Sequence, residues 1–313
     1  MDRVKVVSKP KKKKELIRSY LVTYIADMES GKRRTFRDPL KRVSPSTIRN
    51  LKSFRTKLGK FEKATGKTYA FDDIDMKFYT QFVMWLGERH APNSVGKTIK
   101  QLKTVMQAAL DDDKHTNIVF KKKTFKVTSV LEDKLALTDD DLDLLFNAKG
   151  LPKHLERARD LFLIGCFTLQ RVSDWHKINK ENLRILSDGT KAFELAQKKT
   201  GTKVLIPMLD PRLEVIMKKY DFDPPMMPHQ TINNCIKTVC RKVGLEDKAD
   251  RVSTHTARRT GCTIWYKEEI PMPDIMAVSG HKTETEFRKY IRMEKEEAAI
   301  RISKHKYFTN RMM

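Results

Sequence analysis

The sequence predicts a mainly α-helical protein of two domains with one small antiparallel β-sheet. Its 313 residues are enough for about two domains of ordinary size. Apolar residues recur at helical spacing through most of the chain, whereas the region 183–207 alone has the pattern of short strands joined by turns. A polar and basic segment, 121–134, has no such stripe and predicts a linker between the domains.

The N-terminal part predicts a basic arm followed by a helical domain. Residues 1–14 end in a run of lysines, which is typical of a flexible arm, and the domain is expected over 15–120. Its helices are expected over 15–28, from Ser44, over 75–89 and, capped by Asn93 and Ser94, from residue 93 onward.

Cations gather on the sides of these helices that lie away from the apolar stripes. Such side chains either contact DNA phosphates or are ordinary solvated lysines and arginines. The candidate DNA-binding residues are Arg49, Lys52, Arg55, Lys97, Lys100 and Lys103, with Lys122 in the linker.

The second domain is expected over 135–313. Thr138 precedes the acidic run 139–141 and predicts a helix N-cap, since carboxylates favour that end of the helix dipole. A strongly apolar helix is expected over 157–169. Three strands follow, with Asp188-Gly189 and Gly201 at the turns, and helices resume near Asp210; the strands are expected over 183–187, 191–196 and 203–207.

The charge balance indicates a polyanionic partner. Lys and Arg number 64 against 40 Asp and Glu, a formal net charge of +24, and so large an excess is the electrostatic footprint of nucleic-acid binding. The four cysteines form no Cys-x-x-Cys pair, and no His/Cys cluster has the spacing of a zinc site. The longest apolar run, 161–169, is too short to span a membrane, and no signal-peptide pattern opens the chain, so we expect a cytoplasmic, nucleoid-associated protein.

The C-terminal region carries residues suited to phosphodiester chemistry. His255 and Arg258 lie three residues apart in 254–260 (THTARRT), so they share a helix face; His281 follows Gly280, and Tyr290 comes next. Side-chain attack on a phosphodiester needs a nucleophile, cations for the non-bridging oxygens, an acid for the leaving oxygen and a base. Each of these short patterns alone occurs by chance, but their order in one domain favours a phosphate-binding active site.

Two earlier residues complete this set. Arg171 follows the apolar helix, and arginine binds phosphate bidentately without losing its charge. Asp174 is placed to brace it. Lys199 lies at the turn between the second and third strands, beside Lys198, which leaves two candidates for one catalytic lysine; Lys199 is preferred because it abuts Thr200-Gly201.

Arg171, Lys199, His255-x-x-Arg258, Gly280-His281 and Tyr290 together resemble the active-site set of the tyrosine recombinase (phage integrase) family. The helix start at Leu137-Thr138 and the turn at 199–201 also resemble the integrases of mobile elements. The resemblance implies a core-binding, SAM-like helical domain and a catalytic domain that clamp DNA as a C shape. It also implies that Tyr290 forms a 3′-phosphotyrosine, that Arg171 and Arg258 hold the phosphate with His281, that Lys199 is the acid and His255 the base, and that Asp174 supports them. No metal or cofactor is implied.

The partners implied by the resemblance are double-stranded DNA recombination sites and further copies of the chain, as a tetramer on DNA and a monomer or dimer when free. The tail 300–313 either docks onto a neighbouring subunit or packs on its own domain. Two alternatives stay open: a type IB topoisomerase-like nicking and resealing enzyme, which uses a similar residue set, and a DNA-binding regulator without catalysis.

Overall fold

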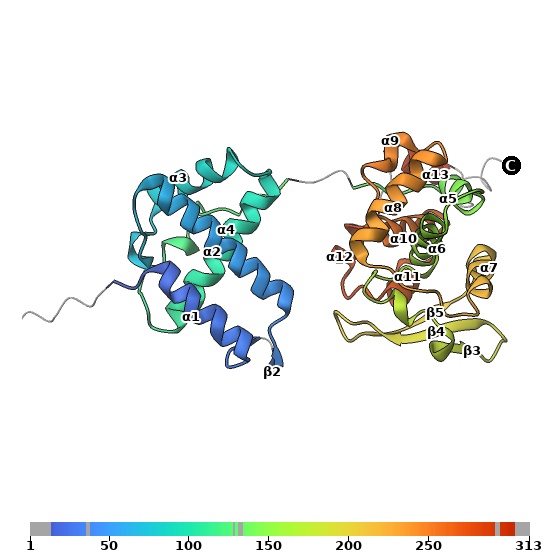
Figure 1. The fold of residues 1–313 in the computed structure, drawn as a ribbon, viewed down its shortest axis with the longest axis horizontal. Coiled ribbons are helices and arrows are strands. Elements are labelled where there is room, and N and C mark those ends of the chain that lie inside the picture. Colours follow the sequence, from blue (N-terminus) through green and yellow to red (C-terminus); the bar gives the residue numbers. More distant parts are fainter. Residues whose placement is uncertain (1–13, 36–37, 128, 131–133, 292–294, 304–313) are drawn as a thin grey trace, which may run out of the picture. The chain divides into compact units, whose positions relative to one another are not determined.

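The computed structural model describes residues 14–35, 38–127, 129–130, 134–291 and 295–303. The chain divides into two compact units, Met1–Glu132 and Asp133–Met313. Both are built mainly of helices, and the second also contains a three-stranded sheet (Figure 1). The predicted fold class is therefore confirmed.

The first unit is a group of four long helices around an aromatic core. Helix α1 contacts α2, and α4 contacts both α2 and α3. Phe54, Phe61 and Phe82 are fully buried among them. The elements are α1 (Ile17–Ser30), β1 (Arg34–Thr35), β2 (Asp38–Arg42), α2 (Pro45–Thr65), η1 (Phe71–Asp73), α3 (Met76–Gly87), α4 (Pro92–Asp111) and η2 (Val119–Lys121).

Two features of this unit differ from the sequence prediction. Helix α4 begins at Pro92, one residue before the expected cap, because proline suits the first helical position. Asn93 lies in the first turn of the helix, and its side chain exchanges hydrogen bonds with the backbone of Val130. The antiparallel pair β1–β2 was not predicted, because all five residues of β2 are exposed and show no alternation between apolar and polar positions.

The segment after α4 packs onto the first unit beyond the expected end of its domain. Phe120 and Phe125 are buried in the core of this unit. Lys103 donates a hydrogen bond to the carbonyl of Phe125 at 3.1 Å, and Tyr79 donates one to the carbonyl of Lys126 at 3.1 Å. The first part of the expected linker is thus held by apolar burial rather than extended in solvent.

Helix α6 is the centre of the second unit and contacts both α8 and α10. A Cβ atom at Gly261 of α10 would lie 2.0 Å from the carbonyl oxygen of Cys166 in α6, so glycine permits this close approach. The helices are α5 (Asp139–Phe146), α6 (Lys153–Thr168), η3 (Trp175–Lys177), η4 (Lys180–Asn182), α7 (Pro211–Lys219), α8 (His229–Lys242), α9 (Glu246–Ala249), α10 (Thr254–Lys267), α11 (Met272–Ser279), α12 (Glu284–Arg288) and α13 (Lys295–Ser303).

The start of α5 has the cap that its sequence predicts. Thr138 Oγ1 accepts a hydrogen bond from the backbone N–H of Asp141, and the Asp141 carboxylate accepts one from the N–H of Thr138. This reciprocal pair satisfies two donors that the helix itself leaves unpaired.

The three predicted strands form one antiparallel sheet in the order β3-β4-β5: β3 (Leu183–Ile185), β4 (Lys191–Ala196) and β5 (Lys203–Pro207). Phe193 of β4 is paired with Leu183 and Ile206 and is fully buried. Helix α11 contacts β5, so the β4–β5 turn and the end of α11 belong to the same packed region.

The C-terminal helix α13 contacts its own domain through Arg301. Its guanidinium donates to the carbonyl of Tyr266 at 3.0 Å and lies over the Tyr266 ring. Ile300 and Ile302 are exposed. The remainder of the predicted docking tail, 304–313, lies outside the described residues. No helix among the described residues is long and apolar enough to cross a membrane.

Candidate active site

Arg258 is the buried cation of the site. Helix α10 begins after Ser253, whose N–H is capped by Thr256, and this start places Arg258 on the face that packs against α6. The side chain is 0% exposed, and Nη1 donates to the carbonyl of Leu169 at 2.9 Å. Burial, followed by the nearby charge of Arg171, lowers the pKa of Arg258 from its ordinary value. No salt bridge joins Arg258 to a carboxylate among the residues that the structure describes, and a buried guanidinium of this kind is a ready site for an anion.

His281 and Tyr290 lie directly against Arg258. Arg258 Nη2 is 3.1 Å from Nε2 of His281, and the Ser279 hydroxyl is 2.8 Å from Nδ1 of the same ring. The Tyr290 ring stacks edge-on against His281 with centroids 4.6 Å apart, and the Arg258 guanidinium lies 5.6 Å from the Tyr290 centroid. Three residues that are well separated in sequence thus form one cluster.

The imidazole of His281 is neutral at physiological pH. Burial is the main cause, and the adjacent Arg258 and Arg171 add to it; together they lower the pKa of His281 to about 3. A neutral ring can donate from one nitrogen and accept at the other. It can therefore bind a phosphate oxygen without adding a charge of its own.

Arg171 reaches the site from the loop after α6. Its Nη1 donates to Oε1 of Gln197 at 2.8 Å, and its charge contributes to the lowered pKa of both Arg258 and His281. The carboxylate of Asp174 takes a different place from the expected brace. It accepts from the backbone N–H of Lys198 at 2.6 Å and from the Ser173 hydroxyl at 3.2 Å, so it holds the β4–β5 turn.

Lys199 and His255 lie at the exposed edge of the cluster. Lys199 is exposed in the β4–β5 turn, as is Lys198. His255 is exposed as a residue, yet partial removal of its ring from water is the main cause that lowers its pKa. The charges of His229, Arg259, Arg258 and Lys199 lower that pKa further. The imidazole therefore favours its neutral, proton-accepting form.

Gln197 and Gln170 are two further residues of the site that the sequence pattern does not predict. Both are buried, and Gln197 Nε2 donates to Oε1 of Gln170 at 2.7 Å. A glutamine before a turn looks like any polar loop residue, so nothing in the sequence pattern singles it out. Among the described residues no group of three or more His, Cys, Asp or Glu is placed to hold a metal ion.

Comparison with known families decides the identity of the fold. The sequence profile of the phage integrase family matches residues 136–297, and that of the phage integrase SAM-like domain matches residues 23–127. The chain belongs to the phage integrase family. Its activity is accordingly that of a site-specific tyrosine recombinase acting on DNA.

Solved structures of recombinases share the integrase fold of this chain. One is the XerH site-specific recombinase in a post-cleavage complex with difH DNA, with TM-score 0.68, 13% identity, and 94% of this chain and 98% of that chain covered. A lambda integrase dimer bound to a COC′ core site gives TM-score 0.66, 18% identity, and 89% and 96% coverage. The Tn1549 transposon integrase in complex with circular-intermediate DNA gives TM-score 0.65 and 14% identity, with 92% of this chain and 99% of that chain covered. No curated protein sequence matches the chain.

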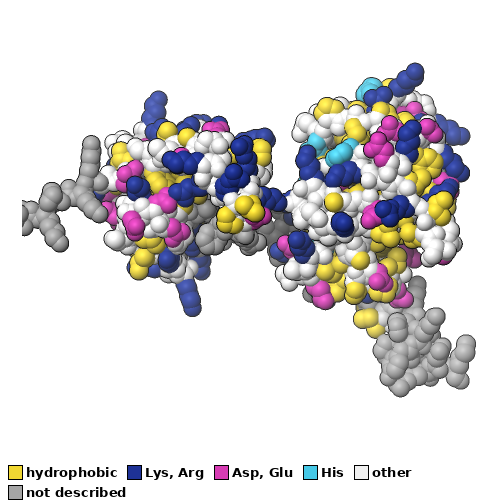
Figure 2. Space-filling view, turned by 90° about the horizontal axis from the view of Figure 1, so that it is seen from below, with side chains coloured by type: hydrophobic (Ala, Val, Ile, Leu, Met, Phe, Trp, Pro, Cys, Tyr) yellow, Lys and Arg dark blue, Asp and Glu magenta, His cyan; other side chains and the backbone are white. Residues whose placement is uncertain are grey.

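The predicted DNA-binding residues of the SAM-like domain differ in their contacts. Arg49, Lys97, Lys100 and Lys122 are exposed, and so is Lys52, although it pairs with Glu29 at 2.6 Å; Arg55 and Lys103 are half-buried. Lys and Arg side chains appear across the visible face of each unit, with acidic side chains interspersed (Figure 2). This distribution suits contact with a backbone of phosphates over a broad surface.

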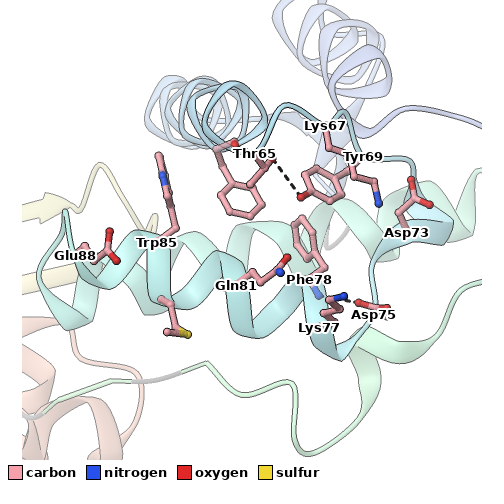
Figure 3. Close-up of a pocket in the computed structure, with 12 residues that line it drawn as sticks. Thr65, Lys67, Tyr69, Asp73, Asp75, Lys77, Phe78, Gln81, Trp85 and Glu88 are labelled. Carbon is pink, nitrogen blue, oxygen red and sulfur yellow. Dashed lines mark hydrogen bonds between the residues drawn. The ribbon is translucent and has the colours of Figure 1, made fainter.

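The SAM-like domain has a pocket of about 660 Å³, which shares no residue with the cluster of Arg258, His281 and Tyr290 (Figure 3). The rings of Phe61, Tyr69, Phe78 and Trp85 pack against one another along it, so its floor is the domain core itself. Its rim mixes acidic and basic side chains. Packing of the core aromatic side chains therefore accounts for this pocket.

Proposed function

We propose that this integrase cleaves and rejoins DNA through a covalent 3′-phosphotyrosine at Tyr290. The observation that carries the proposal is the contact of Tyr290 with neutral His281 beside the buried guanidinium of Arg258. In the cleavage step, the tyrosine oxygen bonds to phosphorus, and the bond from phosphorus to the 5′-oxygen breaks. The reverse attack by a 5′-hydroxyl of another strand reseals the DNA, so no net bond energy is lost.

Arg258 and Arg171 hold the non-bridging oxygens of the scissile phosphate. Arg258 Nη2 faces His281, and a phosphate oxygen would lie between these two groups and accept a hydrogen bond from each of them. Negative charge that develops on these oxygens is then stabilised where water is excluded, which is where such contacts are strongest.

Proton transfer falls to the exposed edge of the site. Lys199 protonates the leaving 5′-oxygen, and its turn is anchored by the contact of Asp174 with the backbone of Lys198. His255, whose pKa is lowered, accepts the proton of Tyr290 as its oxygen attacks. Protons thus move from Tyr290 to His255 and from Lys199 to the 5′-oxygen, and the resealing step returns them.

The wider proposal concerns the DNA and the assembly. Residues 15–120 bind the duplex through the exposed basic side chains, 121–134 link the domains, and 135–313 carry catalysis, with 1–14 as a basic arm. Four copies act on two recombination sites of a mobile element. The similar solved structures named above, in which recombinases are bound to DNA, support this proposal. We place the protein in the cytoplasm with the nucleoid.

A nicked duplex that loses its 5′-hydroxyl fragment after cleavage tests the proposal, because the phosphotyrosine then accumulates. The site must first be sought by binding selection. Wild-type protein is expected to form a covalent adduct and, with a second duplex, to yield recombinant strands. Tyr290→Phe, which keeps the ring packing but lacks the nucleophile, is expected to bind and form no adduct.

The same assay separates the alternatives. Relaxation of supercoiled DNA without recombinant product would favour a type IB topoisomerase-like enzyme. DNA binding with no adduct from wild-type protein on any selected site would favour a regulator without catalysis.

A further inference from the structure

Gln197 occupies a buried position where three parts of the site meet. Its side chain is 1% exposed. It follows strand β4 and opens the turn that carries Lys199. Oε1 accepts hydrogen bonds from Arg171 Nη1 at 2.8 Å and from Thr200 Oγ1 at 3.0 Å. Nε2 donates to the backbone carbonyl of Ser279 at 2.8 Å and to Oε1 of Gln170 at 2.7 Å.

These four contacts use the full hydrogen-bonding capacity of the amide, which has two acceptor lone pairs and two donor hydrogens. The arginine can only donate and the Ser279 carbonyl can only accept, so the two together fix which end of the amide is oxygen. A carboxylate of the same shape would face the Ser279 carbonyl without a donor. The position therefore calls for a neutral group that both accepts and donates.

Gly280 gives a second, independent sign of how closely this side chain is enclosed. A Cβ atom at Gly280 would lie 2.6 Å from both Oε1 and Nε2 of Gln197, and its φ of +70° is one that L side chains rarely adopt. The chain between α11 and His281 thus closes directly on the Gln197 amide. The residue that follows Gly280 is His281, whose ring contacts Arg258 and Tyr290.

Gln170 completes the arrangement from the end of α6. Its side-chain Nε2 donates to the backbone carbonyls of Thr168 and Val278. Its backbone carbonyl accepts a hydrogen bond from Trp175 Nε1 at 3.0 Å. The oxygen that Gln197 contacts is thereby held in place. Gln197 is therefore held by Gln170 on one side, and on the other side it accepts the hydrogen bond from the guanidinium of Arg171.

We propose that Gln197 is a positioning residue that holds Arg171 in the orientation needed to bind the scissile phosphate. It touches Arg171 rather than DNA, and it ties that guanidinium to the turn bearing Lys199 and to the Ser279–His281 segment. Ordering a long arginine side chain costs conformational entropy. A partner that already holds the side chain in place reduces the part of this cost that DNA binding must offset. This inference rests on the proposed function of Arg171.

The test is the single-turnover rate of Tyr290 adduct formation on the nicked duplex. Gln197→Leu keeps the approximate size and removes all four hydrogen bonds; we expect the rate to fall about 10- to 100-fold, as for a catalytic group displaced by about 1 Å. DNA affinity of the same variant should stay within about threefold of wild type, since Arg171 makes only one of many phosphate contacts. Gln197→Glu should also be slow, because its carboxylate would pair with Arg171 and compete with the phosphate.

A double-mutant cycle distinguishes positioning from general support of the fold. In an Arg171→Ala background the Gln197→Leu change should alter the rate by less than about threefold, because its effect passes through the missing guanidinium. Gln81→Leu, at an exposed glutamine of α3, is the matched control and should leave rate and melting temperature unchanged.

A wild-type rate for both Gln197 variants would overturn the inference. So would a full additional loss in the Arg171→Ala background, or a melting temperature so lowered in both variants that the slow rate follows from unfolding. In each of these cases the wild-type adduct still upholds the proposed function, whereas absence of any wild-type adduct would remove that function and this inference with it.

Discussion

At the level of single residues, Arg258 is the group whose burial and charge most clearly indicate an anion-binding site. It is fully buried, it touches a neutral imidazole and an aromatic ring, and burial lowers its pKa. An anion supplied from outside the chain would offset that desolvation. The backbone phosphate of DNA is the anion that fits an integrase.

The choice between Lys199 and Lys198 can be settled by changing the leaving group. Lys199→Ala should slow cleavage about 10²- to 10⁴-fold, the usual contribution of a positioned acid. Replacing the leaving 5′-oxygen by sulfur should restore most of that rate, because a thiolate leaves without a proton. Lys198→Ala should cleave both substrates at wild-type rates. A sulfur-dependent rescue of Lys198→Ala instead would assign the acid to Lys198.

The lowered pKa of His281 predicts how stability depends on pH. In the unfolded chain a histidine takes up a proton below about 6.5, whereas in the folded protein the pKa of His281 is about 3. Between these values the unfolded state binds more protons, so stability is lost as the pH falls. At pH 5 the loss amounts to about 2 kcal/mol.

Melting temperatures at pH 7.5 and pH 5 check this effect. Wild-type protein should lose more stability on acidification than His281→Gln, which has no titrating group at that position. Equal losses in the two proteins would show that the imidazole is not kept neutral by the fold.

Some residues of the candidate site can be predicted from the sequence pattern, and others cannot. Arg258, His281 and Tyr290 could be grouped beforehand because phosphate chemistry demands those residue types in that order, and the structure places them in contact; their roles stay predictions. Gln197 could not be found, because its importance comes from partners brought close only by the packing of α6, β4 and α11. Asp174 was placed near the site from sequence, but the group that it holds is the turn.

At the scale of elements, periodicity explains which strands were predictable. Strand β5 alternates between buried and more exposed positions, and β4 buries three of its six residues; the predicted bounds 191–196 and 203–207 match those observed. Strand β2 is exposed throughout, so its sequence has no period to detect. The start of α4 was misplaced because Asn93 resembles a cap, whereas Pro92 sets the first turn.

The junction between α11 and the β4–β5 turn yields a prediction on stability. Gly189→Ala, at a turn with φ +87° and open space around it, should cost about 1–2 kcal/mol from backbone strain alone. Gly280→Ala should cost about 1–3 kcal/mol more, since its Cβ also meets Gln197. Urea unfolding of both variants measures the difference, and equal losses would show that the enclosure of Gln197 is loose.

At the scale of the whole molecule, the net charge of +24 governs association with DNA. If about eight phosphates are neutralised, the slope of log affinity against log salt should be about −7. Reversing Lys97 and Lys100 to Glu should make that slope shallower by about 2. Fluorescence anisotropy over a salt series measures it, with the melting temperature as a check on folding. A flat salt response would contradict the basic faces as the DNA surface.

The proposed cleavage and rejoining of DNA depends most on Tyr290 being the nucleophile. The decisive measurement is mass spectrometry of the protein–DNA adduct after proteolysis and nuclease digestion. We expect a nucleotide attached by its 3′-phosphate to Tyr290 and to no other residue. A nucleotide on a different side chain, or one attached through a 5′-phosphate, would contradict it.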